Sequence, residues 1–299
     1  MAGRTPQAQA GLTSLRIGIN LLLWTGHVTP ELLPVLEHIA ATGFDGVEVP
    51  LFDTGDPAHY RGLGAMLDGL GLARTASTAF TDPGQNPVSP AASERAAALD
   101  YAREVLDCAA ELGAGLVVGP LFQPLGHFTG TGPSEAERER CAEFLGELAP
   151  YAAERGIVLA VEPLNRFEAH VLNTGAQARD MIARVGDPAV GILYDSFHAH
   201  IEERDPIAAL DAMLAAGALA HVHISENDRG TPGTGQARIA EAIALLAARG
   251  YDGWLTIEAF GQAVPELAAA TRVWRPFFAD PVDVVEGGYA YIRHCLTAC

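Results

Sequence analysis

The sequence of 299 residues contains no lysine, so all 19 of its basic residues are arginine. Schiff-base chemistry needs an amine whose pKa can be lowered by burial, and a guanidinium group cannot replace that amine. The absence of lysine therefore excludes aldolases that use a lysine Schiff base, enzymes that hold pyridoxal phosphate on lysine, and P-loop nucleotidases.

Cysteine is scarce and long apolar runs are missing. The cysteines are Cys108, Cys141, Cys295 and Cys299, with no Cys-x-x-Cys pair, which indicates small hydrophobic side chains of a reducing compartment rather than a disulfide framework. No run of 18 apolar residues occurs, and the polar start MAGRTPQAQAG has no apolar segment of the signal-peptide type. We therefore expect a cytoplasmic protein without a membrane span.

Positive charge is also in short supply. Against 19 arginines stand 37 acidic residues, and the formal net charge is −18. Binding to nucleic acid or to anionic lipid depends on clustered basic side chains, so we expect neither as a partner. Such a surface still admits a neutral sugar and attracts divalent cations.

Short apolar segments alternate with long Ala- and Leu-rich segments from end to end. The short segments predict eight strands, over Arg16–Leu22, Gly46–Val49, Ala73–Ala79, Leu116–Leu121, Val158–Glu162, Val190–Tyr194, Ala220–Ile224 and Gly253–Glu258. The long segments predict helices, among them Pro30–Thr42, Ala91–Leu112, Ser134–Arg155, Thr174–Val185, Pro206–Ala215 and Ala237–Arg249.

This alternation predicts an α/β fold, a single (β/α)8 TIM barrel, because eight strands with about eight helices suit a closed parallel barrel. No Gly-x-Gly-x-x-Gly follows the first strand, which weakens the dinucleotide-binding alternative. We expect a flexible lead-in over residues 1–14 and one barrel domain over residues 15–299, with an extra C-terminal helix over Val282–Leu296.

Metal-type ligands stand at the ends of four successive predicted strands. They are Glu162, Asp195, His221 or His223, and Glu258. The C-terminal ends of barrel strands meet at one face, where active sites of this fold lie. Carboxylates after apolar runs are costly unless paired or bound to metal. Three carboxylates and one imidazole suit a hard divalent ion such as Mn²⁺, Mg²⁺ or Co²⁺ better than structural zinc.

The segments around these residues resemble the ketose 3-epimerase family, which includes D-tagatose, D-allulose and L-ribulose 3-epimerases within the xylose-isomerase-like barrels. The motifs are EPLNRFE (162–168), YDSFHAHIEE (194–203), HVHISENDRG (221–230) and TIEAF (256–260), together with LLWTGH (22–27) and GTG (233–235). The resemblance covers most of the chain from residue 16 onward. Pro163 and His200 depart from the pattern of the family.

The resemblance implies a role for each matching position. The metal ligands are Glu162, Asp195, His223 and Glu258, with Mn²⁺ as the expected cofactor, and Glu162 and Glu258 are also the catalytic bases. Substrate hydroxyl groups are held by Glu168, His198 and Arg229, and Trp24 walls the sugar pocket or packs in the core. We expect His221 and His223 to point to opposite sides of their strand, with only His223 facing the barrel mouth.

Two glutamates suit inversion at carbon 3 of a free ketose. Removing a proton from one face of a planar cis-enediolate and returning one on the other requires two opposed bases. A divalent ion bound to the oxygens at carbons 2 and 3 stabilises the developing charge. The alternative is an aldose–ketose isomerase of the hydroxypyruvate or inosose type, which would use the same ligands.

Two further expectations concern residues outside this set. Glu48 ends the second predicted strand and either orients a substrate group or bonds backbone. The aromatic group Trp274, Phe277 and Phe278 suggests a subunit contact or ordinary core, and we expect a homodimer or homotetramer.

Overall fold

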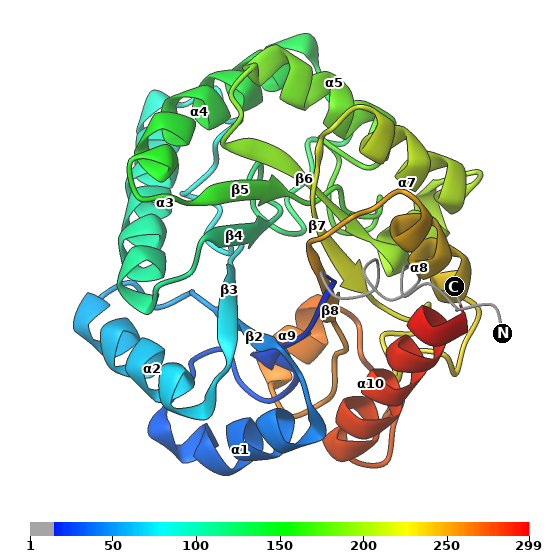
Figure 1. The fold of residues 1–299 in the computed structure, drawn as a ribbon. Coiled ribbons are helices and arrows are strands. Elements are labelled where there is room, and N and C mark those ends of the chain that lie inside the picture. The colour runs from blue at the N-terminus through cyan, green and yellow to red at the C-terminus, as the bar shows by residue number, and fades with distance from the viewer. Residues whose placement is uncertain (1–14, 299) are drawn as a thin grey trace, which may run out of the picture.

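The computed structural model describes residues 15–298, and its eight parallel strands form a closed barrel in chain order (Figure 1). The strands are β1 Arg16–Asn20, β2 Gly46–Pro50, β3 Ala73–Ser77, β4 Leu116–Gly119, β5 Val158–Val161, β6 Val190–Asp195, β7 Leu219–Ile224 and β8 Trp254–Ile257. The predicted fold class is confirmed. The lead-in predicted over residues 1–14 lies outside the described residues, and the predicted domain boundaries stay a prediction.

Helices surround the strands on all sides (Figure 1). They are α1 Leu33–Thr42, α2 Pro57–Leu70, α3 Ala92–Leu112, α4 Glu135–Ala153, α5 Gly175–Val185, α6 Ser196–Glu202, α7 Pro206–Ala215, α8 Ile239–Ala248, α9 Pro265–Ala270 and α10 Pro281–Ala298, with 3₁₀ turns η1 Leu21–Leu23 and η2 Pro30–Leu32. The predicted C-terminal helix is α10, which packs against α8 and α1 and so completes the ring. Within residues 15–298, no helix has both the length and the apolar character that a membrane crossing requires.

Three helices were not singled out by the sequence patterns. The helix α2 contains several glycines, which lower helix propensity, but tertiary packing requires one of them. A side chain at Gly64 would approach the backbone oxygen of Leu112 to 2.6 Å, so glycine allows α2 to lie close to α3. The helices α6 and α9 have only 7 and 6 residues, too few to give a periodic pattern.

The first strand is shorter than predicted because a side chain ends it. Asn20 accepts a hydrogen bond from the backbone nitrogen of Leu22 at 2.9 Å and thereby caps η1. The turn buries Leu21, Leu22 and Leu23 in place of a longer strand.

The interior of the barrel has an apolar half and a polar half. Val118, Ala160 and Leu193, on β4 to β6, form a small cluster of their own. The remaining strands place buried polar side chains inside, namely Asn20, Glu48, Thr75, His221, His223 and Thr256. Buried polar groups are costly unless partnered, so the polar half is where a functional centre is expected.

Candidate active site and metal centre

Four strand ends bring their metal-type side chains together. One ligand atom from each of Glu162, Asp195, His223 and Glu258 lies within 4.8 Å of the others, and all four residues are buried. Backbone bonds set these positions: the nitrogen of Glu162 donates to the oxygen of Gly119 at 2.9 Å, extending the ladder between β4 and β5. Asp195 lies opposite His223 in the register of β6 and β7.

The atoms of this cluster fit a divalent cation. Glu162 Oε1 and His223 Nδ1 are buried, and neither makes a hydrogen bond to any residue between 15 and 298. His223 Nδ1 lies 3.6 Å from an oxygen of Asp195 and 3.5 Å from one of Glu258. Burial, with the charge of Glu258 beside it, raises the pKa of Glu162 well above its ordinary value. A cation among these atoms would relieve that repulsion and use the free lone pairs, and three oxygens with one imidazole nitrogen suit a hard ion.

Asp195 uses its two oxygens for different purposes. Oδ1 caps α6 by accepting from the backbone nitrogens of Phe197 at 2.6 Å and His198 at 3.1 Å. Oδ2 accepts from Arg229 at 2.9 Å. Burial alone would raise the pKa of Asp195, but the charge of Arg229 and its other partners hold it well below its ordinary value. The helix cap therefore orients a charged carboxylate toward the cluster.

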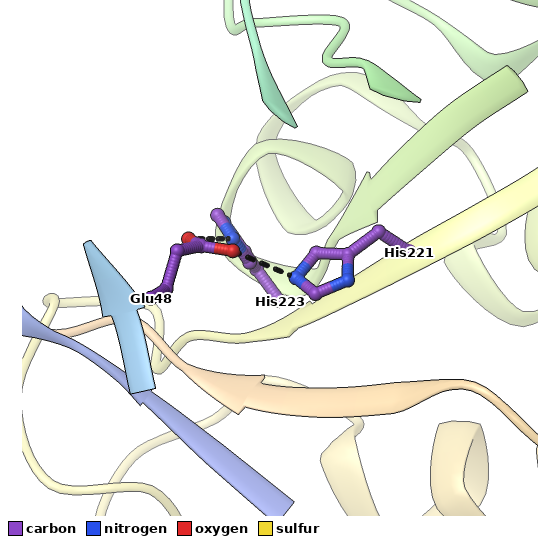
Figure 2. A group of neighbouring side chains, drawn as sticks. All are labelled: Glu48, His221 and His223. Atoms are coloured by element: carbon purple, nitrogen blue, oxygen red, sulfur yellow. Dashed lines mark hydrogen bonds and ion pairs between the residues drawn. The ribbon is translucent and has the colours of Figure 1, made fainter. Parts of the chain in front are cut away.

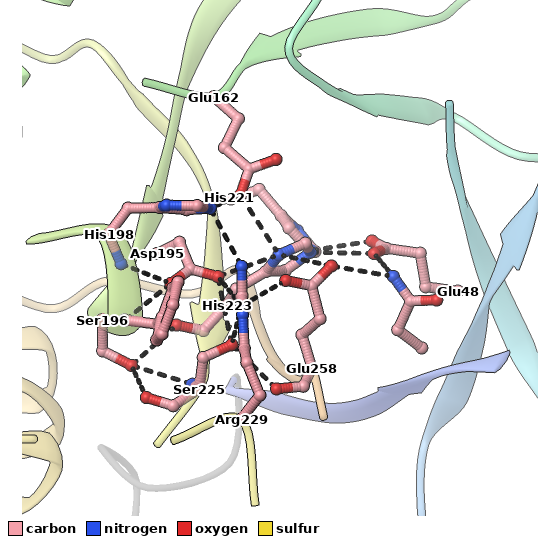
Figure 3. Close-up of polar contacts among 12 residues, drawn as sticks. Glu48, Glu162, Asp195, Ser196, His198, His221, His223, Ser225, Arg229 and Glu258 are labelled. Carbon is pink, nitrogen blue, oxygen red and sulfur yellow. Dashed lines mark hydrogen bonds and ion pairs between the residues drawn. The ribbon is translucent and has the colours of Figure 1, made fainter. Parts of the chain in front are cut away.

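Arg229 joins two of the candidate metal ligands. Its Nη1 donates to Asp195 Oδ2 at 2.9 Å and to Glu258 Oε2 at 2.6 Å, as Figure 3 shows. The guanidinium carbon lies 4.0 Å from the ring centroid of Phe197 and 4.8 Å from that of Phe260. Its backbone has φ 63°, in the left-handed region, which is unfavourable for a side chain of this size and is found at functional sites.

His198 and Glu168 continue the polar wall. His198 Nε2 accepts from Arg229 Nη2 at 2.9 Å and lies 3.4 Å from Glu162 Oε1. Glu168 Oε1 accepts from Asn165 Nδ2 at 2.7 Å. Burial lowers the pKa of His198 to about 4, so this ring is neutral at physiological pH.

A pocket of about 530 Å³, partly open to solvent, lies over the cluster. Its polar side includes Glu162, Glu168, His198, His223, Arg229 and Glu258, and its apolar side includes Leu22, Phe52, Leu125, Phe260 and Leu267. Trp24 is not among the lining residues and packs, partly buried, against the main core.

The expectation that His221 and His223 point to opposite sides of their strand was wrong, although of the two only His223 lines the pocket. Figure 2 shows both rings directed at the carboxylate of Glu48, inside the barrel. Residues two apart on a strand share a face, so the two rings differ in depth and not in side. The expectation for Glu48 is also corrected, because its carboxylate meets side chains: His223 Nε2 at 2.8 Å, Asn20 Nδ2 at 2.9 Å and Thr75 Oγ1 at 2.9 Å.

Several residues of the site were not predicted. Ser225 Oγ accepts from Arg229 at 2.7 Å, and the backbone nitrogen of Asn165 lies 3.0 Å from His198 Nδ1. Both residues occur inside the quoted motifs, so their closeness in the sequence to the candidate ligands could have pointed to them. The apolar wall from Phe52, Leu125 and Leu267 comes from two loops and the helix α9, far apart in the chain, and has no signal in the sequence.

Comparison with known proteins places this site in a known context. The family described as "Xylose isomerase-like TIM barrel" matches residues 36–277. The ketose 3-epimerase of Arthrobacter globiformis is 32% identical over 291 residues, which is 95% of this chain and 98% of that protein.

Solved structures agree with the sequence relatives. An L-ribulose 3-epimerase superposes with a TM-score of 0.89 at 28% identity and covers 95% of each chain. A D-allulose 3-epimerase from Methylomonas sp., in complex with D-allulose, superposes with a TM-score of 0.86 at 28% identity, covering 94% of this chain and 97% of that one.

Proposed function

The chain belongs to the ketose 3-epimerases of the xylose isomerase-like TIM barrel family, and from that premise we propose that it inverts carbon 3 of a free ketose. The observation that carries the proposal is the meeting of Glu162 and Glu258 in one buried cluster of ligand atoms that could hold a cation. Figure 3 shows the two side chains entering the cluster from different sides. Two separated carboxylates are what inversion through a planar intermediate requires.

Each glutamate has a defined task in this mechanism. One carboxylate removes the proton at carbon 3, which leaves a cis-enediolate, and the other returns a proton to the opposite face. The two exchange tasks when the reaction runs from the other epimer. Arg229 donates to Glu258 Oε2 at 2.6 Å, which fixes the direction of that carboxylate and keeps a positive charge beside the reacting carbons.

We propose Glu162, Asp195, His223 and Glu258 as the ligands of one divalent cation, and Mn²⁺ as the ion. When bound, the cation stabilises negative charge on the oxygens of carbons 2 and 3. The support is the donor set and the two buried lone-pair atoms without hydrogen bonds to described residues, Glu162 Oε1 and His223 Nδ1.

Glu168, His198 and Arg229 are proposed to hold the hydroxyl groups near the reacting carbons. All three line the pocket. His198 supports this role by its surroundings, since Arg229 and the backbone nitrogen of Asn165 both point donors at its ring. A neutral imidazole accepts at one nitrogen only, so one contact has to open, and a sugar hydroxyl can take its place. Trp24 as a wall of the sugar pocket stays a prediction.

The substrate is proposed to be unphosphorylated. Among the residues that line the pocket, Arg229 is the one arginine and there is no lysine, and its Nη1 already donates to Asp195 and Glu258. The far side of the pocket is apolar, which suits the carbon face of a sugar chain and offers a phosphate no partner.

A solvent-exchange experiment tests this function against the aldose–ketose isomerase alternative. The protein with Mn²⁺ is incubated in D2O with D-fructose, D-tagatose or L-ribulose, and the products are separated and examined by NMR. We expect a 3-epimer with deuterium at carbon 3 and none at carbon 1. An aldose product, or deuterium at carbon 1, would overturn the proposal in favour of the isomerase.

A further inference from the structure

Glu48 is a buried acid that the proposed mechanism leaves unused. It lies within β2 and is fully buried, with an exposed fraction of 0%. A carboxylate buried at the centre of a barrel is costly unless it is partnered, so its partners have to explain it.

The two oxygens of Glu48 are directed at two different sets of groups. Oε1 accepts from His223 Nε2 at 2.8 Å and from Asn20 Nδ2 at 2.9 Å. Oε2 accepts from Thr75 Oγ1 at 2.9 Å and lies 3.0 Å from His221 Nε2. Figure 2 shows the carboxylate set between the two imidazole rings.

The bond to Oε1 determines what His223 presents to the cation site. Because Nε2 donates to a carboxylate, the lone pair of the ring in its neutral form stands on Nδ1. That nitrogen is the one directed at Asp195 and Glu258, at 3.6 and 3.5 Å. Carboxylates that hold the second nitrogen of a ligating histidine fix its orientation and strengthen it as a ligand.

Asn20 extends the same link to a second ligand. Its Nδ2 donates to Glu48 Oε1 at 2.9 Å and also to Glu258 Oε1 at 3.3 Å. The carboxylate of Glu48 is therefore linked to His223 by one hydrogen bond and to Glu258 by two hydrogen bonds through Asn20 (Figure 3).

We propose that Glu48 is a positioning residue of the metal site, which holds His223 by its Nε2 and aligns Glu258 through Asn20. This inference rests on the proposed metal centre and adds a residue that does not touch the cation. A rival is that Glu48, His221 and His223, which also have ligand atoms within 4.8 Å of one another, bind a cation themselves. The bonds from Asn20 and Thr75 argue against it, because they already occupy lone pairs of both Glu48 oxygens.

The test measures Mn²⁺ binding directly, apart from activity. Metal-free wild type and Glu48→Gln are titrated with Mn²⁺, and free Mn²⁺ is followed by electron paramagnetic resonance. Glutamine keeps the size of glutamate and one acceptor oxygen for His223 and Asn20, but it loses the negative charge, and its amide nitrogen cannot accept from Thr75. We expect one ion per chain for both proteins and a Kd about 10- to 100-fold higher for the variant.

A matched control shows whether weaker Mn²⁺ binding comes from the position of Glu48 or from the loss of any buried carboxylate. Glu137 pairs with His170 at 3.0 Å, their side chains are 10% and 8% exposed, and neither residue belongs to the cluster at the cation site. Glu137→Gln is expected to lower the unfolding temperature while leaving the Kd for Mn²⁺ within about twofold of wild type. A folded Glu48→Gln protein with wild-type Kd overturns the inference, as do two ions per wild-type chain.

Wild-type protein supplies a second measurement should Glu48→Gln not fold. In protein loaded with diamagnetic Mg²⁺ and labelled with ¹⁵N-histidine, NMR is expected to show the ring proton of His223 on Nε2. A proton on Nδ1 would overturn the inference. Wild-type protein that binds no divalent ion would refute the proposed metal centre itself. Wild-type protein and Glu48→Gln that bind Mn²⁺ equally well would refute only the role of Glu48.

Discussion

At the scale of single residues, Glu258 and Glu162 differ in their surroundings although they share a chemistry. Glu258 accepts from Arg229 at 2.6 Å and from Asn20 at 3.3 Å. Glu162 Oε1 makes no hydrogen bond within the described part of the chain. The first carboxylate is held by side chains, whereas the second is left free for the proposed cation and substrate.

Replacing Glu258 by glutamine should therefore abolish turnover and spare the fold. The amide keeps the size and can coordinate weakly, but it cannot accept the proton of carbon 3. Loss of an essential base costs on the order of 10² to 10⁴ in rate, measured as kcat on the ketose found active. Glu241→Gln, in an exposed pair with Arg238, is the control and should keep wild-type kcat. Turnover of Glu258→Gln within tenfold of wild type would exclude Glu258 as a base.

At the scale of elements, the strand ends and the helices that follow them share residues. Asp195 is the last residue of β6 and the N-cap of α6. Its structural and chemical duties can be separated, because asparagine caps helices as well as aspartate does but carries no charge.

We expect Asp195→Asn to retain its unfolding temperature within a few degrees and to bind Mn²⁺ at least tenfold more weakly. The reason is that the cap bonds to Phe197 and His198 survive, while one charged ligand is lost. Asp205→Asn, at the N-cap of α7, provides the control with the same chemical change away from the site. Circular dichroism and metal titration give the two readouts, and equal Mn²⁺ affinity in both variants would exclude Asp195 as a ligand.

Glu137, in the first turn of α4, is expected to make the stability of the protein depend on pH. Burial alone would raise the pKa of Glu137, but hydrogen bonds from His170 and Ser134 bring it below the model-peptide value of 4.5. A carboxyl group with a lowered folded-state pKa stabilises the protein above its unfolded pKa, and that contribution disappears as pH falls through the folded pKa. Glu137→Gln should therefore lower the free energy of unfolding by about 1 to 3 kcal/mol at pH 7.

The difference between wild type and Glu137→Gln is expected to shrink below pH 4.5. Urea unfolding at several pH values measures it. A destabilisation that stays constant down to the acid transition would mean that the charge of Glu137 plays no part.

At the scale of the whole molecule, the proposed cation would link the strand ends of β5, β6, β7 and β8. Anything that binds only the folded state stabilises it, by about 2.7 kcal/mol at a concentration 100 times its Kd. We expect EDTA to lower the unfolding temperature and abolish activity, and Mn²⁺ to restore both. Full activity in chelator, with no divalent metal found by elemental analysis, would contradict the metal centre.

Assembly is also a property of the whole molecule. Of the aromatic group near the C-terminus, Phe277 and Phe278 pack against core clusters, while Trp274 is 69% exposed. An exposed tryptophan of this kind suits a subunit contact, and we propose a homodimer or homotetramer. Light scattering should report a multiple of 31.4 kDa at micromolar concentration, and a monomer would contradict the proposal.

Much of this protein follows from its sequence alone. Short apolar segments and long Ala- and Leu-rich segments differ in the spacing of their hydrophobic residues, and their regular alternation predicts the strands and helices of a barrel. Six of the eight strands begin at the predicted residue. The ligand candidates Glu162, Asp195 and Glu258 follow from chain position, since the carboxyl ends of parallel strands converge at one face.

Tertiary structure alone decided how the residues of the barrel interior meet. Glu48 and His223 are 175 residues apart, and no local pattern pairs them; closing the barrel does, because it fills a shared interior with side chains from every strand. The same holds for the apolar wall of the pocket and for Arg229 between Asp195 and Glu258. Sequence periodicity determines which way a side chain points, whereas its partner depends on strand register and on the closure of the sheet.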